Sequence, residues 1–111
     1  MTISEHDRDS VETILAFCGK ITSKIEAVSL EQFLLDEDIQ DIIIRRIMVI
    51  GEACTRLSNE LREQNEKIEV KKIIGLRNIL VHGYDAIDLE SVYLIATERV
   101  KELSIVLNEV L

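Results

Sequence analysis

The residues best suited to chemistry lie in one short segment, residues 75–85, which reads GLRNILVHGYD. Arg77 and Asn78 precede an apolar run, and His82 follows that run directly before Gly83, a residue type that commonly ends helices. In the last turn of a helix, His82 lies at the negative end of the helix dipole, which favours the protonated imidazole. We therefore expect a histidine that gains and loses a proton near neutral pH or above it, as acid/base catalysis requires.

Helical spacing relates the polar side chains of this segment to one another. Asn78 lies four residues before His82, on the same helix face, where it can hydrogen-bond and orient the imidazole. Arg77 lies five residues before His82 and points about 140° away from it on a straight helix. The two can still reach one ligand through the length of arginine, through loosening near Gly83, or across a two-fold symmetric dimer.

This combination of groups suits phosphodiester transfer on RNA. An imidazole can accept the proton of a 2′-hydroxyl, a second one can protonate the leaving oxygen, and a guanidinium can stabilise the phosphate charge. The RNA supplies its own nucleophile, so we expect neither a metal nor a cofactor. Because one chain offers a single histidine here, the scheme calls for a dimer. The alternative is an ion-pairing surface Arg77 with a His82 that only caps its helix, and spacing alone does not separate the two.

The elements that must position this segment are predicted to be helices. The 111 residues include no proline and four glycines, and apolar residues recur at helical spacing through most of the chain. We predict one domain, residues 1–111, with an all-α fold: an antiparallel bundle of four long helices and one short helix. The long helices are expected near 5–27, from 36 or 38 to 57, near 69–82 and from 88 onward, and the short one near 29–34.

Capping patterns predict several of these helix starts, because a Ser or Asp is followed three residues later by a polar side chain. The pairs are Ser4 with Asp7, Ser29 with Gln32, and Asp88 with Ser91. Isoleucines 42–44 suit a strand by propensity, but the length of the apolar pattern around them favours a helix. The polar residues 58–67 are expected to form a connection or an exposed helix end.

Charge and hydropathy exclude several classes of protein. The chain has 13 Lys and Arg against 21 Asp and Glu, a net charge of -8, which argues against a non-specific nucleic-acid coat protein. Its 47% hydrophobic content is too high for a disordered chain. No apolar run approaches the roughly 18 residues of a membrane span, and residues 1–9 are too polar for a signal peptide. We therefore expect a cytoplasmic protein with no membrane contact.

Two cysteines, Cys18 and Cys54, lie among apolar residues. No CxxC pair or Cys/His cluster is present, so a structural zinc site is not expected. The sequence leaves two possibilities, a disulfide or two buried free thiols, and the apolar neighbours favour buried thiols in a reducing compartment.

The motif formed by Arg77, four residues, His82, one residue and Tyr84 resembles that of the HEPN domain family, in its HepT-like toxin branch. A second segment, residues 50–53 (IGEA), is similar to a signature of the same branch, and Phe33 before the central helix also fits. A tryptophan often follows the motif in the last helix of this family. Tyr93 is the nearest aromatic residue here, and we expect it to be a core residue.

This resemblance implies a metal-independent endoribonuclease toxin that acts as a homodimer, with two motifs lining a cleft between the protomers. Arg77 and His82 would be catalytic, with Asn78 in support, and RNA rather than DNA would be the substrate. The resemblance also implies an MntA-type nucleotidyltransferase antitoxin that adds AMP to the motif tyrosine, here Tyr84. A second possibility is a non-catalytic HEPN subunit that binds a nucleotide or its nucleotidyltransferase partner.

Two further features carry open alternatives. Glu52 either orients a motif residue such as Arg77 or forms a hydrogen bond that fixes helix packing. A basic patch of Lys67, Lys71, Lys72 and Arg77, to which Arg45 and Arg46 can add, either positions an RNA backbone or is a solvated helix face.

Overall fold

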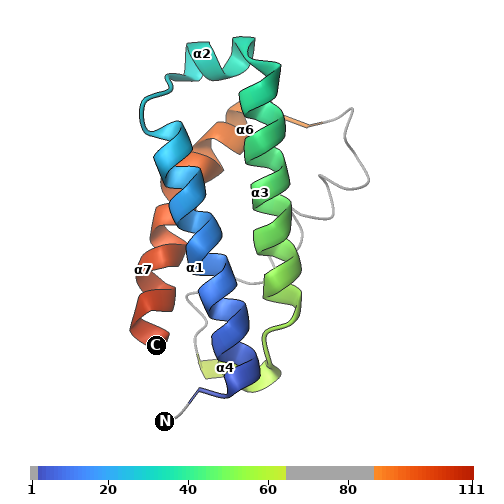
Figure 1. Ribbon diagram of the computed structural model, residues 1–111, viewed down its shortest axis with the longest axis vertical. Helices are drawn as coiled ribbons and strands as arrows, with labels where there is room; N and C mark the ends of the chain where they lie inside the picture. Colours follow the sequence, from blue (N-terminus) through green and yellow to red (C-terminus); the bar gives the residue numbers. More distant parts are fainter. Residues whose placement is uncertain (1–2, 65–86) are drawn as a thin grey trace.

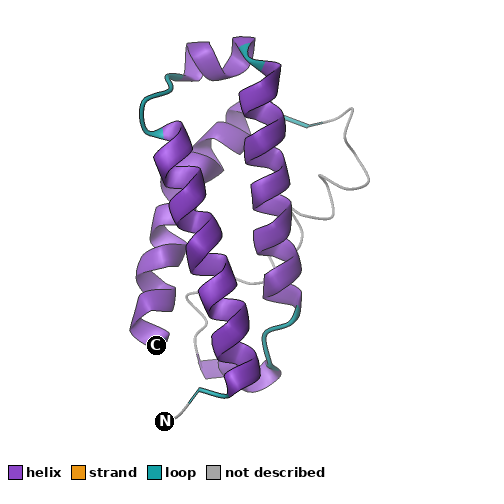
Figure 2. Ribbon diagram, in the orientation of Figure 1, coloured by secondary structure: helices purple, strands orange, loops and turns teal. Residues whose placement is uncertain are grey.

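The computed structural model describes residues 3–64 and 87–111 of the chain (Figure 1). Every regular element in these two ranges is helical, which confirms the all-α fold class, and no strand occurs in them (Figure 2). The elements are α1 (Glu5–Ile25), α2 (Leu30–Leu35), α3 (Glu37–Thr55), α4 (Asn59–Gln64), α6 (Leu89–Leu94), the π-helical turn η3 (Ile95–Arg99) and α7 (Val100–Val110). The predicted helix near 69–82 lies outside the described residues.

The two longest helices, α1 and α3, lie side by side and run antiparallel, with α2 crossing between them at one end (Figure 1). α7 packs along α1 and lies behind it in this view, so that α3 and α7 share the one buried face of α1 (Figure 1). α4 lies at the opposite end from α2, beside the start of α1 (Figure 1). The predicted antiparallel packing therefore holds for the helices that the structure describes.

The predicted N-caps are confirmed by their hydrogen bonds. The Ser4 hydroxyl accepts from the backbone N–H of Asp7 at 3.1 Å, and Ser29 and Gln32 form a complete capping box at α2. The Asp88 carboxylate accepts from the backbone N–H of Glu90 at 3.1 Å at the start of α6. These caps are local and satisfy otherwise unpaired N–H groups of the first turn, which explains why spacing alone predicts them.

Helix ends and the polar connection differ from the prediction in small ways. α1 ends at Ile25 and α3 at Thr55, each two residues earlier than expected. Residues 59–64 of the expected connection form the short helix α4, whose first turn is capped by Ser58 through a 3.2 Å bond from Leu61 N–H. Leu61 is buried, so α4 packs against the bundle as a helical turn.

The predicted last helix is interrupted by the wide turn η3, which the sequence pattern did not indicate. Its buried residues recur every four positions across this turn, at Val92, Ala96 and Val100. A regular α-helix turns 400° in four residues, so such a stripe drifts away from the core. The π turn holds more residues per turn and keeps these side chains facing inward.

The core lies where α1, α3 and the last helix meet, and Phe33 closes it at the α2 end. Its fully buried large side chains are Phe33, Ile14, Ile21, Ile43, Leu107, Val11 and Val92, with Cys18 and Cys54. Ile43 and Ile44 belong to α3, so the helix interpretation of residues 42–44 is confirmed.

Tyr93 is partly buried against this core. Its ring lies 5.5 Å from that of Phe33, and its hydroxyl donates to the Val28 carbonyl at 2.6 Å. Tyr93 therefore ties the last helix to the connection between α1 and α2.

Both cysteines are free and buried, which confirms the free-thiol alternative over a disulfide. Burial raises the pKa of Cys18 and of Cys54 to about 12 in each case. Because the thiolate is the reactive form of cysteine, both side chains act here as core residues.

Candidate functional site

The motif residues Arg77, Asn78, His82 and Tyr84 lie outside the described residues, as do the lysines 67, 71 and 72 of the expected basic patch. What the structure describes is the helical frame on either side of residues 65–86. α4 precedes that segment and α6 follows it, and side-chain hydrogen bonds anchor both helices.

The cap of α4, the helix before this segment, is held by a buried carboxylate, that of Asp7, which is 4% exposed. Asp7 accepts hydrogen bonds from the backbone N–H of Ser58 at 2.8 Å and from the Ser58 hydroxyl. Burial opposes ionisation, but the hydrogen bonds from Ser58 and Ser4 outweigh it and lower the pKa of Asp7. An ionised carboxylate thus joins the first turn of α1 to the cap of α4.

The sequence pattern predicts Asp7 only as part of the capping pattern of Ser4. The backbone N–H of Asp7 does bind Ser4, but its side chain binds Ser58, which lies 51 residues away. One signal for burial was present: Asp7 continues the apolar stripe of α1 through Val11 and Ile14. A carboxylate on such a stripe requires hydrogen-bond donors from another element.

A second link holds α4 against the end of α3. The Arg62 guanidinium donates from Nη2 to the carbonyl of Cys54 at 2.9 Å and to that of Thr55 at 3.1 Å. Carbonyls at a helix C-terminus lack intrahelical partners, so a cation there is favourable. Asp7 and Arg62 together fix α4 from two sides.

The first turn of α6, the helix after this segment, is fixed by its Asp88 cap. Besides its backbone contact, the Asp88 carboxylate accepts from the Ser91 hydroxyl at 2.8 Å. Hydrogen bonds from Ser91 and Glu90 lower the pKa of Asp88, with the Ser91 hydroxyl as the main cause. The predicted role of Asp88 as a cap is therefore confirmed.

Two other candidate residues, His6 and Glu52, lie within the described ranges. His6 is exposed and its Nε2 lies 2.9 Å from the Arg56 carbonyl, as suits the surface residue that its polar surroundings predict. Glu52 is partly buried on α3 beside the buried Gly51. Its two alternative roles stay predictions, because Arg77 lies outside the described residues.

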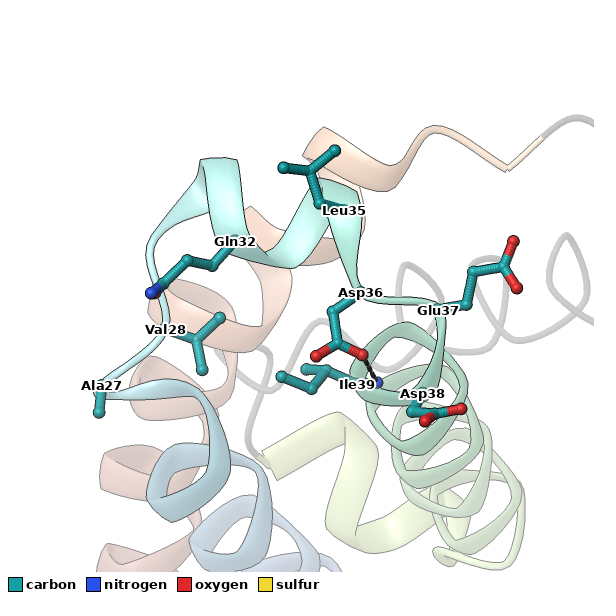
Figure 3. Close-up of a pocket in the computed structure, with 8 residues that line it drawn as sticks. All are labelled: Ala27, Val28, Gln32, Leu35, Asp36, Glu37, Asp38 and Ile39. Carbon is teal, nitrogen blue, oxygen red and sulfur yellow. Dashed lines mark hydrogen bonds between the residues drawn. The ribbon is translucent and has the colours of Figure 1, made fainter.

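A hollow at the corner of α1, α2 and α3 is acidic (Figure 3). Asp36, Glu37 and Asp38 contribute carboxylates to its rim, and Asp36 accepts a 3.1 Å bond from Ile39 N–H as the cap of α3. Three carboxylates at one rim repel a phosphate. This hollow does not suit RNA.

The described ranges contain no group of three or more His, Cys, Asp or Glu side chains placed to hold a metal ion. Across the same ranges, no helix combines the length and the apolar character needed to cross a bilayer.

Comparison with known proteins adds a family to this frame. The family described as "Ribonuclease HepT-like" matches residues 14–110. Among similar proteins, "Putative RNase TTE0752" from Caldanaerobacter subterraneus subsp. tengcongensis is 29% identical over 104 residues, covering 94% of this chain and 93% of the relative. "Putative RNase MJ1380" from Methanocaldococcus jannaschii is 32% identical over 90 residues, covering 81% and 83%. "Probable ribonuclease HepT" from Thermococcus cleftensis is 25% identical over 96 residues, covering 86% and 87%.

No solved structure matches the chain. The family match spans α1 from Ile14 through α7, and it includes the whole segment between α4 and α6. The chain is thus a member of the HepT-like ribonuclease family.

Proposed function

We propose that this protein is a metal-independent endoribonuclease toxin that acts as a homodimer in the cytoplasm. The observation that carries the proposal is the family match over residues 14–110, which contains the complete Arg77, His82 and Tyr84 motif. The names of the relatives, which call them RNases, support ribonuclease activity as a class.

In the proposed reaction the 2′-hydroxyl of the RNA is the nucleophile, and two imidazoles act as general base and general acid. The 2′-oxygen forms a bond to the adjacent phosphorus while the bond from phosphorus to the 5′-oxygen breaks. His82 of one protomer takes the 2′-hydroxyl proton, and the partner's His82 gives a proton to the departing 5′-oxygen. The products are a 2′,3′-cyclic phosphate and a 5′-hydroxyl.

The remaining motif residues have supporting roles in this scheme. Arg77 binds the non-bridging phosphate oxygens and stabilises the charge that develops on them. Asn78 orients the imidazole of His82 from one helical turn away. An MntA-type nucleotidyltransferase partner transfers AMP from ATP to the Tyr84 hydroxyl and releases pyrophosphate. The added anion then competes with the substrate phosphate.

Expression in a bacterial host without a nucleotidyltransferase partner tests this proposal. We expect growth arrest by the wild-type chain and none by His82→Ala or Arg77→Ala at equal soluble level. His6→Ala is the matched control, because His6 is an exposed histidine outside the motif, and it is expected to arrest growth like wild type. The mass of Tyr84-containing peptides must show that the tyrosine is unmodified.

Arrest that persists in His82→Ala contradicts the catalytic role of His82. Unmodified, soluble wild-type chain without any effect on growth or RNA contradicts the toxin assignment. That result favours the alternative of a non-catalytic subunit that binds a nucleotide or its nucleotidyltransferase partner.

A further inference from the structure

A basic hollow lies on the surface between α1 and α3, away from the acidic corner. It is lined by three cationic and three small residues: Ala16, Gly19, Lys20, Ser23, Lys24 and Arg46. Lys20 and Lys24 are exposed on α1, and Arg46 is partly buried on α3. Of these cations, only Arg46 belongs to the basic patch that the sequence predicts.

Two of the cations, Arg46 and Lys20, are held in place by contacts with α1. The Arg46 guanidinium reaches from α3 to α1, where its Nη1 donates to the Lys20 carbonyl at 3.0 Å. Arginine carries further N–H donors that this one bond does not use. The Lys20 ammonium lies 4.5 Å from the centre of the Phe17 ring, which favours this position by a cation–π contact.

The hollow lies in the only long stretches of α1 and α3 that lack carboxylates. Residues 13–25 of α1 contain no Asp or Glu, and neither do residues 42–51 of α3. The helices run antiparallel, and the Arg46 bond to Lys20 sets these two stretches against each other. Within residues 3–64 and 87–111, the structure pairs none of the three cations with a carboxylate. A chain of net charge -8 therefore keeps a concentrated positive surface here.

The floor of the hollow leaves room for a close approach. Gly19 has no side chain, and a Cβ built there would meet no atom within 4 Å. Ser23 adds a hydroxyl one turn further along the helix. Lys20 and Lys24 are also one turn apart, a rise of about 6 Å along the axis. Lys20 and Lys24 therefore follow one another along the helix axis.

We propose that this hollow binds the phosphodiester backbone of the RNA substrate, away from the cleavage chemistry. The inference rests on the proposed ribonuclease function for the identity of the polymer. A shallow open surface with cations spaced along a helix axis suits a chain of phosphates, whereas small anions are usually held in enclosed pockets. Contacts to the backbone position a strand without reading its bases. The hollow therefore increases affinity for long RNA and leaves the chemical step unchanged.

The test measures binding of full-length protein to a labelled 2′-O-methyl RNA strand long enough to cross both helices. This strand keeps its phosphates but lacks the 2′-hydroxyl nucleophile, so binding is measured without cleavage. Lys20→Gln/Lys24→Gln is compared with Arg99→Gln/Lys101→Gln, which removes the same charge from exposed positions on η3 and α7. The Arg46 bond survives in the first variant, because its acceptor is the Lys20 backbone carbonyl.

We expect Lys20→Gln/Lys24→Gln to weaken binding about tenfold near 0.1 M salt, with an unchanged melting temperature. The slope of log K against log salt should fall by roughly 1.4, since each single-strand phosphate contact contributes about 0.7. The control pair should bind within about twofold of wild type. In cleavage assays, KM for long RNA should rise while kcat, and turnover of a dinucleotide, stay unchanged.

Equal binding by the two double variants overturns the proposal, because net charge alone then explains any loss. Binding of tripolyphosphate, a small anion, is measured on the same variants. If Lys20→Gln/Lys24→Gln loses tripolyphosphate binding but keeps RNA binding, the proposal is also overturned and the hollow is assigned to a small anion. The 2′-O-methyl strand reports binding only. A protein that binds this strand through the hollow but cuts no RNA therefore contradicts the proposed ribonuclease activity, while RNA binding by the hollow stands.

Discussion

The two halves of α1 use charge in opposite ways. At its start, α1 carries Glu5, Asp7, Asp9 and Glu12, and the Asp7 carboxylate is buried and bound by Ser58. From residue 13 to residue 25 the only charged residues of the helix are Lys20 and Lys24, which are exposed beside Arg46. One end of the helix therefore uses its charge to hold the fold together, and the other presents charge to solvent.

This contrast separates the expected effects of mutation. A charge that is desolvated and hydrogen-bonded inside the protein affects the free energy of unfolding when it is removed. An exposed charge affects it little but changes the affinity for a charged ligand. Substitutions at the start of α1 should thus change stability, and substitutions in its second half should change RNA binding.

The largest effect on stability is expected from Asp7→Asn. The substitution removes an ionised acceptor and places an amide N–H₂ or a single oxygen against two donors of Ser58. We expect a loss of about 2 kcal/mol in the free energy of unfolding, as for a charge-assisted buried hydrogen bond. Urea denaturation measures it, and Asp9→Asn, an exposed neighbour on the same helix, should stay within about 0.5 kcal/mol of wild type.

The same carboxylate predicts a pH dependence. Because the pKa of Asp7 is lowered from its ordinary 3.8 in the folded chain, its stabilisation is complete above the unfolded pKa. It is lost as pH falls below 3.8 through the folded pKa. The difference in unfolding free energy between wild type and Asp7→Asn should shrink over that range. A difference that stays constant down to the acid transition contradicts an ionised, hydrogen-bonded Asp7.

A smaller effect is expected where the last helix meets the end of α1. Tyr93→Phe keeps the ring against Phe33 but removes the 2.6 Å hydrogen bond to the Val28 carbonyl. We expect about 1 kcal/mol of destabilisation, measured by thermal or urea unfolding. Unchanged stability would mean that water replaces the hydroxyl at no cost, and would remove Tyr93 as a link between these elements.

The smallest effect, and one of opposite sign, is expected from Gly19→Ala. A helical glycine costs roughly 0.5–1 kcal/mol against alanine, and the added methyl meets no atom within 4 Å. The free energy of unfolding should therefore rise by about that amount. If the floor of the basic hollow contacts the RNA backbone, the same methyl should weaken binding of the 2′-O-methyl strand slightly. If Gly19→Ala is more stable but binds the strand as wild type does, the RNA contacts Lys20, Lys24 and Arg46 without touching the floor of the hollow.

Local features of the fold could be read from the sequence, and distant contacts could not. The caps at Ser29 and Asp88 depend on neighbours within three residues, so spacing predicts them. The bond from Ser58 to Asp7 joins residues 51 positions apart, and the π turn Ile95–Arg99 lies where the last helix packs onto the core. Neither is encoded in a local pattern.

The candidate sites divide in the same way. The motif from Arg77 to Tyr84 is contiguous and visible in the sequence, although it lies outside the described residues. The basic hollow depends on which part of α3 faces α1. Lys20 and Lys24 look like ordinary surface lysines until the Arg46 bond places them beside a third cation.

The most direct test of the proposed function is RNA cleavage by the purified, unmodified protein in EDTA, with the ends of the products identified. Wild type and His6→Ala should cut RNA and leave 2′,3′-cyclic phosphate and 5′-hydroxyl ends, while His82→Ala cuts none. Products with a 5′-phosphate, or cleavage that survives His82→Ala, would contradict a reaction in which this histidine activates the RNA's own 2′-hydroxyl.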